Sequence, residues 1–176
     1  MDSIETIKAN CDNKEYFFNV VKEKGAYLEW ASPMLQDDKE LVLEAVKQDG
    51  GALEFASDRL KGDKEVLLSS LDKVGWVACY ASDKLKDDKD VILKAAKKDG
   101  QVLYYASQRL RNDKEVVKEA VSQKGLILKY ASKELREDKE IAIAALSQDL
   151  RAKSYIDEKL LDDEDIQNII NPKKED

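Results

Sequence analysis

The amino-acid sequence predicts an all-α fold, a right-handed or otherwise curved α-solenoid of about six 25-residue helix-turn-helix repeats with terminal capping helices. The main observation is a fixed period, because five of the seven glycines recur every 25 residues. An aromatic residue follows each of these glycines after five residues, with Ala-Ser directly behind it. Self-similarity at such a period is typical of stacked repeats, in which each unit buries its apolar face only against its neighbours.

Four columns of residues define the repeat. Glycine stands at Gly25, Gly50, Gly75, Gly100 and Gly125, and in a degenerate sixth copy its place is taken by Leu150. The aromatic column comprises Trp30, Phe55, Tyr80, Tyr105, Tyr130 and Tyr155. Leucine recurs at Leu35, Leu60, Leu85, Leu110, Leu135 and Leu160. Asp-Lys-Glu or a close variant begins at Asp38, Asp63, Asp88, Asp113 and Asp138.

These columns divide the chain into six repeats and two ends. The repeats cover residues 13–37, 38–62, 63–87, 88–112, 113–137 and 138–162. We expect an N-terminal capping helix within residues 1–12, and a C-terminal capping helix and tail within residues 163–176. Both ends carry apolar residues at helical spacing, which suits helices that shield the last apolar faces of a stack.

The repeat pattern resembles the tandem repeats of the family known as domain of unknown function 4116. The resemblance covers nearly the whole chain and is carried by elements such as Asp38-Lys39-Glu40, Gly50 and Phe55-Ala56-Ser57. It implies a helical repeat fold. It brings no established biochemical activity, so the function has to be inferred from the residues themselves.

The first half of each repeat is expected to be an amphipathic helix. In the second repeat, Asp38 is placed to accept hydrogen bonds from the amides of a first helical turn. The apolar residues within 41–46 then follow the helical period. Gly50 comes just after the last polar turn, where a left-handed C-terminal cap favours a residue without a Cβ atom.

The second half of each repeat is expected to contain about two further helical turns. Residues 51–57 show two apolar pairs separated by one polar position. In the first repeat Pro33 directly follows Ser32, and proline is best tolerated at the first position of a helix. We therefore predict a break at the serine, with Leu35 in a short closing turn of its own.

Composition bounds the cellular setting. The formal net charge is −7, which argues against a basic field for binding nucleic acid without sequence preference. The start Met1-Asp2-Ser3-Ile4-Glu5 lacks the features of a signal peptide, and no apolar run approaches ~18 residues. Cys11 and Cys79 are too few and too far apart for a disulfide framework or a thiolate metal cluster. We expect a soluble, cytoplasmic protein.

No set of residues points to catalysis, a metal or a cofactor. The chain has no histidine, the residue most often used for proton transfer near neutral pH. The repeated serines have no histidine or evident lysine base at a fixed spacing, and they fit helix caps better than nucleophiles. The acidic runs at 37–38, 87–88 and 162–165 lack the alternating ligands of a calcium loop. The aromatic column fits packing within or between repeats better than stacking on nucleobases. We expect a non-enzymatic protein.

A comparison of the repeats with one another gives a candidate binding surface. Positions one and four residues after the glycine column vary between repeats and become large and apolar in the central ones. The candidate partner-binding residues are Trp76, Cys79, Tyr104, Leu126 and Lys129. Trp76 and Cys79 would share one helical face. The alternative is that Trp76 and Leu126 fill wider gaps between repeats.

A local basic island gives a second candidate. Between Asp88 and Asn112, six basic residues stand against three acidic ones, so the net charge is +3. The island comprises Lys94, Lys97, Lys98, Arg109 and Arg111. It would suit RNA or an acidic protein surface, although a solvated helix face is the default explanation of such a charge pattern. The favoured function is therefore a protein-protein interaction module, and the alternative is a nucleic-acid-associated protein or an inhibitor that occupies a nucleic-acid enzyme.

Overall fold

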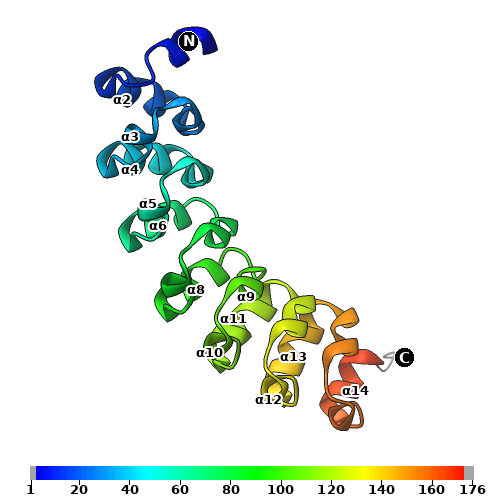
Figure 1. Ribbon diagram of the computed structural model, residues 1–176. Coiled ribbons are helices and arrows are strands. Elements are labelled where there is room, and N and C mark those ends of the chain that lie inside the picture. The colour runs from blue at the N-terminus through cyan, green and yellow to red at the C-terminus, as the bar shows by residue number, and fades with distance from the viewer. Residues whose placement is uncertain (1–2, 173–176) are drawn as a thin grey trace. The chain divides into compact units, whose positions relative to one another are not determined.

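The computed structural model describes residues 3–172, and all regular secondary structure within that range is helical. The sequence-based prediction of an all-α repeat fold is therefore confirmed. The chain divides after Leu85 into two compact units. Figure 1 shows the helices of both units in chain order, and each unit is described by itself. The curved path of a solenoid stays a prediction, and residues 173–176 of the expected tail lie outside the described residues.

Unit 1 contains the elements of the first three repeats and the helix that precedes them. In chain order these are α1 (Ile4–Ala9), α2 (Lys14–Glu23), η1 (Gly25–Trp30), α3 (Pro33–Gln36), α4 (Lys39–Gln48), η2 (Gly50–Phe55), α5 (Asp58–Lys61), α6 (Lys64–Leu71), η3 (Trp76–Tyr80) and α7 (Asp83–Lys86). The elements named η are 3₁₀ helices. Each repeat thus consists of one longer α-helix, a 3₁₀ helix and a single closing turn of α-helix.

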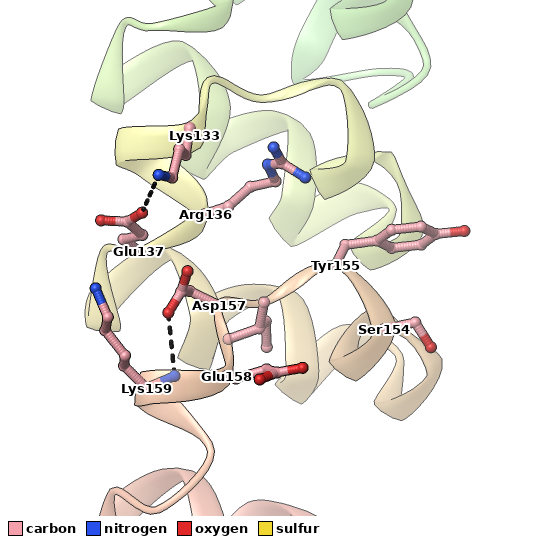
Figure 2. Close-up of a pocket in the computed structure, with 9 residues that line it drawn as sticks. Lys133, Arg136, Glu137, Ser154, Tyr155, Asp157, Glu158 and Lys159 are labelled. Atoms are coloured by element: carbon pink, nitrogen blue, oxygen red, sulfur yellow. Dashed lines mark hydrogen bonds and ion pairs between the residues drawn. The ribbon is translucent and has the colours of Figure 1, made fainter.

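Unit 2 repeats this order with small variations. Its elements are α8 (Lys89–Ala96), α9 (Val102–Tyr105), α10 (Gln108–Arg111), α11 (Lys114–Gln123), η4 (Gly125–Tyr130), α12 (Lys133–Arg136), α13 (Lys139–Gln148), η5 (Leu150–Tyr155), η6 (Glu158–Leu160) and α14 (Glu164–Ile170). The closing turn of the last repeat is the 3₁₀ helix η6, which begins where Asp157 accepts a hydrogen bond from the Lys159 amide at 3.0 Å (Figure 2).

Two layers of helices form each unit. In unit 1 the longer helices α2, α4 and α6 pack side by side, and the 3₁₀ helices η1, η2 and η3 form a second row against them (Figure 1). In unit 2 the longer helices α8, α11, α13 and α14 make one row, and α9, η4 and η5 make the other. The core lies between the two rows, because each element is too short to persist without its neighbours.

The longer helices begin and bury their faces as their sequences predict. Asp38 accepts a hydrogen bond from the Leu41 amide at 3.0 Å, and the equivalent aspartates cap α6, α8, α11, α13 and α14 in the same way. On α4, the side chains of Leu41, Val42, Ala45 and Val46 are fully buried. This spacing places the four side chains on one stripe that faces the second row.

The second element of each repeat differs from the prediction of about two ordinary helical turns. In five of the six repeats it is a 3₁₀ helix, and only α9 is a single turn of α-helix. Its central pair of residues, such as Ala52 and Leu53, is fully buried. The tighter 3₁₀ winding lets a segment of six residues span from the glycine column to the Ala-Ser pair while it presents this pair inward. The predicted break is confirmed, because α3 begins at Pro33 and contains Leu35.

Three of the serines at this break cap the closing turns, and Ser32 does not. Ser57, Ser107 and Ser132 each accept a hydrogen bond from the backbone amide of the leucine three residues later, at 3.2 to 3.3 Å. Ser32 stands at the N-cap of α3, but its buried hydroxyl has no hydrogen-bond partner among the described residues. The expected cap by Ser32 is therefore absent, and Pro33, which has no N–H to satisfy, starts the turn without it.

Close packing, and not a left-handed cap, explains the glycine column. The predicted cap was wrong, because no glycine within residues 3–172 has a positive φ. A Cβ atom added at Gly25 would lie 2.3 Å from the Ala45 carbonyl oxygen in the following repeat. At Gly125 the same atom would lie 2.3 Å from the Ala145 carbonyl oxygen. The start of the second element therefore meets the backbone of the next longer helix so closely that no side chain fits.

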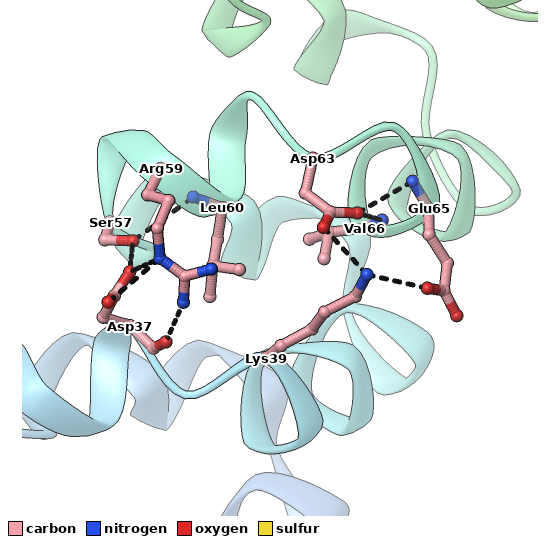
Figure 3. A network of polar contacts seen from close by, with 8 residues as sticks. All are labelled: Asp37, Lys39, Ser57, Arg59, Leu60, Asp63, Glu65 and Val66. Atoms are coloured by element: carbon pink, nitrogen blue, oxygen red, sulfur yellow. Dashed lines mark hydrogen bonds and ion pairs between the residues drawn. The ribbon is translucent and has the colours of Figure 1, made fainter.

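A ladder of lysines joins successive repeats within each unit. The Lys39 ammonium lies 2.8 Å from a carboxylate oxygen of Asp63 and 2.8 Å from one of Glu65, at the start of the next longer helix (Figure 3). In the same way, Lys14 binds the start of α4, Lys89 that of α11, Lys114 that of α13 and Lys139 that of α14. The aspartate in each case is also the helix cap, so one carboxylate both begins a helix and fixes it to the preceding repeat.

A second polar contact, the arginine staple, occurs only at alternate junctions between repeats. In unit 1 the Arg59 Nε donates to the two Asp37 carboxylate oxygens at 2.9 and 3.1 Å, and Nη2 donates to the Asp37 carbonyl oxygen at 2.7 Å (Figure 3). The Ser57 hydroxyl donates to the same carboxylate. In unit 2, Arg109 and Ser107 bind Asp87 in a similar way, with the Arg109 Nε donating to one carboxylate oxygen at 3.0 Å. The two junctions of the other kind carry Gly62 beside Ser82, and Asn112 hydrogen-bonded to Ser132.

Candidate interaction surface

A pocket in unit 2 brings together three of the five candidate partner-binding residues. It lies between α9 and η4 and has a volume of about 370 Å³. Tyr104, Leu126 and Lys129 line it, as the comparison of repeats suggested for a shared surface. Its other walls come from residues that the sequence analysis did not select: Gln101, Tyr105, Lys124, Ile127 and Tyr130.

Aromatic rings form the apolar part of this pocket. The Tyr104 ring makes edge-to-face contacts with the rings of Tyr105 and Tyr130, each with centroids 4.9 Å apart. Because Tyr130 belongs to the following repeat, this cluster joins two repeats. Tyr104 is 50% exposed even so, and Tyr105 is 37% exposed. Large aromatic side chains with this degree of exposure supply rigid contact area to a ligand at low entropic cost.

Two lysines make the rim of the pocket positive. The Lys129 ammonium lies 4.7 Å from the centroid of the Tyr130 ring, and a hydrogen bond with the Tyr130 hydroxyl raises the pKa of Lys129. Lys124 also lines the pocket. Neither lysine has an ion pair with a carboxylate in the described part of the chain, and no acidic residue lines this pocket. The pocket therefore offers aromatic faces beside positive charge that no neighbouring carboxylate neutralises.

Trp76 and Cys79 lie in unit 1, on η3. The Trp76 side chain is 46% exposed, and its ring lies over the preceding repeat, where a Cβ atom on Gly51 would come within 3.4 Å of it. Its ring also contacts Tyr80, with centroids 5.9 Å apart. Trp76 thus covers the open space above Gly51 and still presents nearly half of its surface to solvent.

The basic island does not offer five available cations. Lys97 and Lys98 are exposed at the end of α8, and Lys94 is half-buried on the same helix. Arg109 belongs to the arginine staple with Asp87. Arg111 donates from Nε to the Ala106 carbonyl oxygen at 2.9 Å and from Nη2 to the Tyr104 carbonyl oxygen at 2.6 Å. Both guanidinium groups therefore have structural partners, which removes two members from the expected surface for an acidic ligand.

The side chains of the aromatic column are less buried than the core side chains of the same elements. Trp30, Phe55, Tyr80, Tyr130 and Tyr155 are half-buried, whereas the fully buried side chains are those two or three residues earlier, such as Leu28 and Leu53. Two of the column's rings, those of Tyr105 and Tyr130, line the pocket in unit 2. The column was assigned to packing alone, and the sequence signal that distinguishes this pocket is the extra Tyr104 beside Tyr105.

Within residues 3–172, no group of three or more cysteine, aspartate or glutamate side chains is placed to hold a metal ion. None of the helices in this range combines the length and the apolar character needed to cross a bilayer.

The helical pairs, their ladder and their regular period define a tandem helical repeat protein. The sequence matches the family model for a domain of unknown function, DUF4116, three times in tandem, over residues 13–61, 63–111 and 113–161. The chain therefore belongs to this family. Each match spans two 25-residue repeats, and in the first two matches the arginine staple joins the two repeats of the pair. No curated protein and no solved structure matches the chain.

Proposed function

We propose that this protein is a non-enzymatic protein-protein interaction module, and that the pocket between α9 and η4 receives a short acidic segment of a partner protein. The observation that carries the proposal is the grouping of Tyr104, Leu126 and Lys129 in one pocket. The tyrosines would hold an apolar side chain of the segment. Lys124 and Lys129 would face its carboxylates.

The arrangement of the scaffold supports this proposal. The ladder and the glycine contacts hold the repeats of unit 2 against one another, so the pocket is formed before a ligand arrives. The residues that vary between repeats, Tyr104 and Leu126, are exposed or half-buried, whereas the repeated residues are buried or paired. A scaffold of constant packing with variable exposed positions is the arrangement by which repeat proteins bind partners.

The alternative of a nucleic-acid-associated protein, or of an inhibitor of a nucleic-acid enzyme, depends on the basic island. That surface is weakened because Arg109 and Arg111 are committed to Asp87 and to backbone carbonyl groups. A cytoplasmic location belongs to the favoured proposal, and it is consistent with Cys11 and Cys79, neither of which forms a disulfide.

Selection from a displayed library of random peptides tests the favoured function. We expect the full chain to enrich segments with one large apolar residue flanked by aspartate or glutamate. Tyr104→Ala should weaken the selected peptides by about 2 kcal/mol, or ~30-fold, as expected for an aromatic anchor. Met34→Ala is the matched control, because Met34 is 68% exposed and does not line this pocket.

Two results would contradict the proposal. One is a selection that yields no consensus, or whose peptides bind the Tyr104→Ala variant as tightly as the unchanged protein. The other is tight binding of a single-stranded RNA with a steep dependence on salt concentration, which would favour the alternative.

A further inference from the structure

The family model matches three pairs of repeats, residues 13–61, 63–111 and 113–161. The arginine staple is present in the first two pairs and is missing in the third. The positions of Asp37, Ser57 and Arg59 recur 50 residues later as Asp87, Ser107 and Arg109. After another 50 residues they are Glu137, Asp157 and Lys159. All three positions have therefore changed together in the last pair, within unit 2.

A pocket of about 470 Å³ lies where the third staple would be. Glu137, Asp157 and Lys159 all line it, together with Lys133, Arg136 and Tyr155 (Figure 2). Lys159 makes no ion pair with a described carboxylate, so it does not replace the arginine. Glu137 has only a long contact of 3.6 Å with Lys133, and the Asp157 side chain accepts a hydrogen bond from the Lys159 amide.

Two carboxylates line this pocket at the sequence positions of the staple's acceptors, without an arginine between them. In the first pair, a guanidinium group binds the carboxylate and the carbonyl oxygen of one residue, Asp37, at 2.7 to 3.1 Å. Glu137 supplies the equivalent carboxylate. Asp157 adds a second carboxylate in the place of the serine hydroxyl. A planar group with several donors matches such a set, whereas an ammonium group satisfies it only in part.

We propose that this pocket binds the guanidinium group of an arginine side chain from a partner polypeptide, in the position that Arg59 and Arg109 occupy in the other two pairs. The site is separate from the pocket around Tyr104, and binding here does not require that pocket. The lining carries three cations, Lys133, Arg136 and Lys159, against three carboxylates, Glu137, Asp157 and Glu158. The recognition therefore depends on the geometry of the acceptors rather than on a net negative field.

The staple itself indicates a polypeptide ligand. In the first two pairs, the guanidinium group that binds the acceptors comes from a polypeptide side chain, Arg59 or Arg109. The pocket of about 470 Å³ is also larger than a guanidinium group alone requires, so it has room for the rest of an arginine side chain.

Nuclear magnetic resonance titration of the full chain with the blocked peptide acetyl-Gly-Arg-Gly-amide tests the site. The backbone amides of residues 133–137 and 154–159 should shift. The same peptide with lysine, or with citrulline in place of arginine, should bind at least about tenfold more weakly, because lysine lacks the planar set of donors and citrulline lacks the positive charge. Free arginine should bind more weakly than the peptide, because its own α-carboxylate would lie near Glu137 and Asp157.

A variant that restores the staple is the sharpest test of the proposed arginine site. The triple change Glu137→Asp, Asp157→Ser and Lys159→Arg recreates the residues of the first two pairs, so an internal guanidinium should fill the pocket. We expect a thermal midpoint no lower than that of the unchanged protein and an arginine-peptide affinity at least about tenfold lower, since the internal group competes at high effective concentration.

Lys153→Arg, an exposed change in η5 outside the pocket lining, is the control, and this variant should bind the arginine peptide as tightly as the unchanged protein does. Equal binding of the lysine peptide, no binding of the arginine peptide at millimolar concentration, or full binding by the triple variant would overturn the proposal.

Discussion

At the scale of single residues, the glycine column shows how one missing atom sets the distance between repeats. Gly25 donates its backbone N–H to the Gln48 side chain at 2.6 Å, and its Cα faces the Ala45 carbonyl group. Both partners belong to the following repeat. The second element of one repeat is thus held against the first helix of the next by a hydrogen bond and by direct backbone contact, which a methyl group would prevent.

The pair Gly25→Ala and Gly62→Ala tests this distance within unit 1. The added methyl group at position 25 would lie 2.3 Å from a backbone oxygen, so we expect a loss of about 2 to 3 kcal/mol in the free energy of unfolding. At position 62 the nearest atoms would lie 3.4 Å and 3.6 Å away, which is ordinary contact, and the backbone there is already helical. Urea unfolding of both variants measures the difference. A similar stability for the two would show that the close approach is not rigid.

The residue scale is also where sequence reasoning was least complete. A glycine at the end of a helix is usually read as a left-handed cap, and nothing local in the sequence reveals that Gly50 or Gly125 instead faces a carbonyl group one repeat away. The role of Arg111 was hidden in the same way, since a charged residue in a basic run gives no sign that it binds two backbone carbonyl groups. Such contacts depend on how repeats stack, which the period indicates only in outline.

At the scale of elements, the aspartate that begins each longer helix has two functions. Burial raises the pKa of Asp113, but hydrogen bonds from Lys89 and from the Val116 amide, with the attraction to Lys89, outweigh this effect, so the pKa is lowered overall. One oxygen accepts from the first turn of α11. The other lies 2.8 Å from the Lys89 ammonium. Helix initiation and attachment to the preceding repeat are therefore linked through one side chain.

Two substitutions at this position separate the functions. Asp113→Ala removes both the cap and the ion pair, and we expect a loss of about 1 to 2 kcal/mol in the free energy of unfolding. Asp113→Asn keeps an oxygen that caps the helix and loses only the charge, so its loss should be clearly smaller and should fade in concentrated salt. Chemical unfolding at low and high salt distinguishes the two. Equal losses would mean that the cap contributes nothing here.

The elements themselves were largely predictable. The aspartate caps, the stripe on each longer helix and the break before Pro33 all followed from local patterns that the structure confirms. The 3₁₀ form of the second element did not, because six residues are too few for a hydrophobic period to distinguish the two kinds of helix. The pocket at Tyr104 was predicted in part: the variable positions selected Tyr104, Leu126 and Lys129, but not the neighbouring column residues that complete its walls.

At the scale of the whole molecule, the ladder makes stability depend on pH through many similar groups. The pKa values of Asp38, Asp63, Asp113 and Asp138 are lowered, although burial alone would raise them, because lysines and backbone amides donate to their carboxylates. Hydrogen bonds from Lys114 and then Lys118 hold the pKa of Glu140 at about 2. The corresponding lysines, Lys39, Lys89 and Lys114, have raised pKa values because these carboxylates accept their hydrogen bonds.

The direction of the pH dependence follows from these shifts. In the unfolded chain the aspartates take up protons near pH ~4, before the folded carboxylates do, so protonation favours unfolding as the pH falls below this value. The stabilisation is present above pH ~4 and is lost towards the lower folded pKa values. The lysines contribute stability below pH ~10, which is lost as the pH rises through their raised values.

Thermal unfolding followed by circular dichroism between pH 2 and pH 11 checks this expectation. The midpoint temperature should be nearly constant from about pH 5 to pH 9, fall steeply below pH ~4 and fall again above pH ~10. In about 1 M salt the fall on both sides should be shallower, because the charges involved are partly exposed and screened. A midpoint that stays constant down to pH 2 would show that the ladder does not contribute to stability.

Junctions with and without the arginine staple alternate along much of the chain, and this alternation affects how the number of repeats can change during evolution. Recombination between its own copies adds or removes stretches of the gene, and a new junction keeps the staple only where an Asp37-type residue meets an Arg59-type residue. A step of 50 residues within the first two pairs preserves that match, whereas a step of 25 residues would bring two unlike ends together. Inheritance should therefore favour arrays that differ by whole pairs, which is also the size of the segment that the family matches three times in tandem.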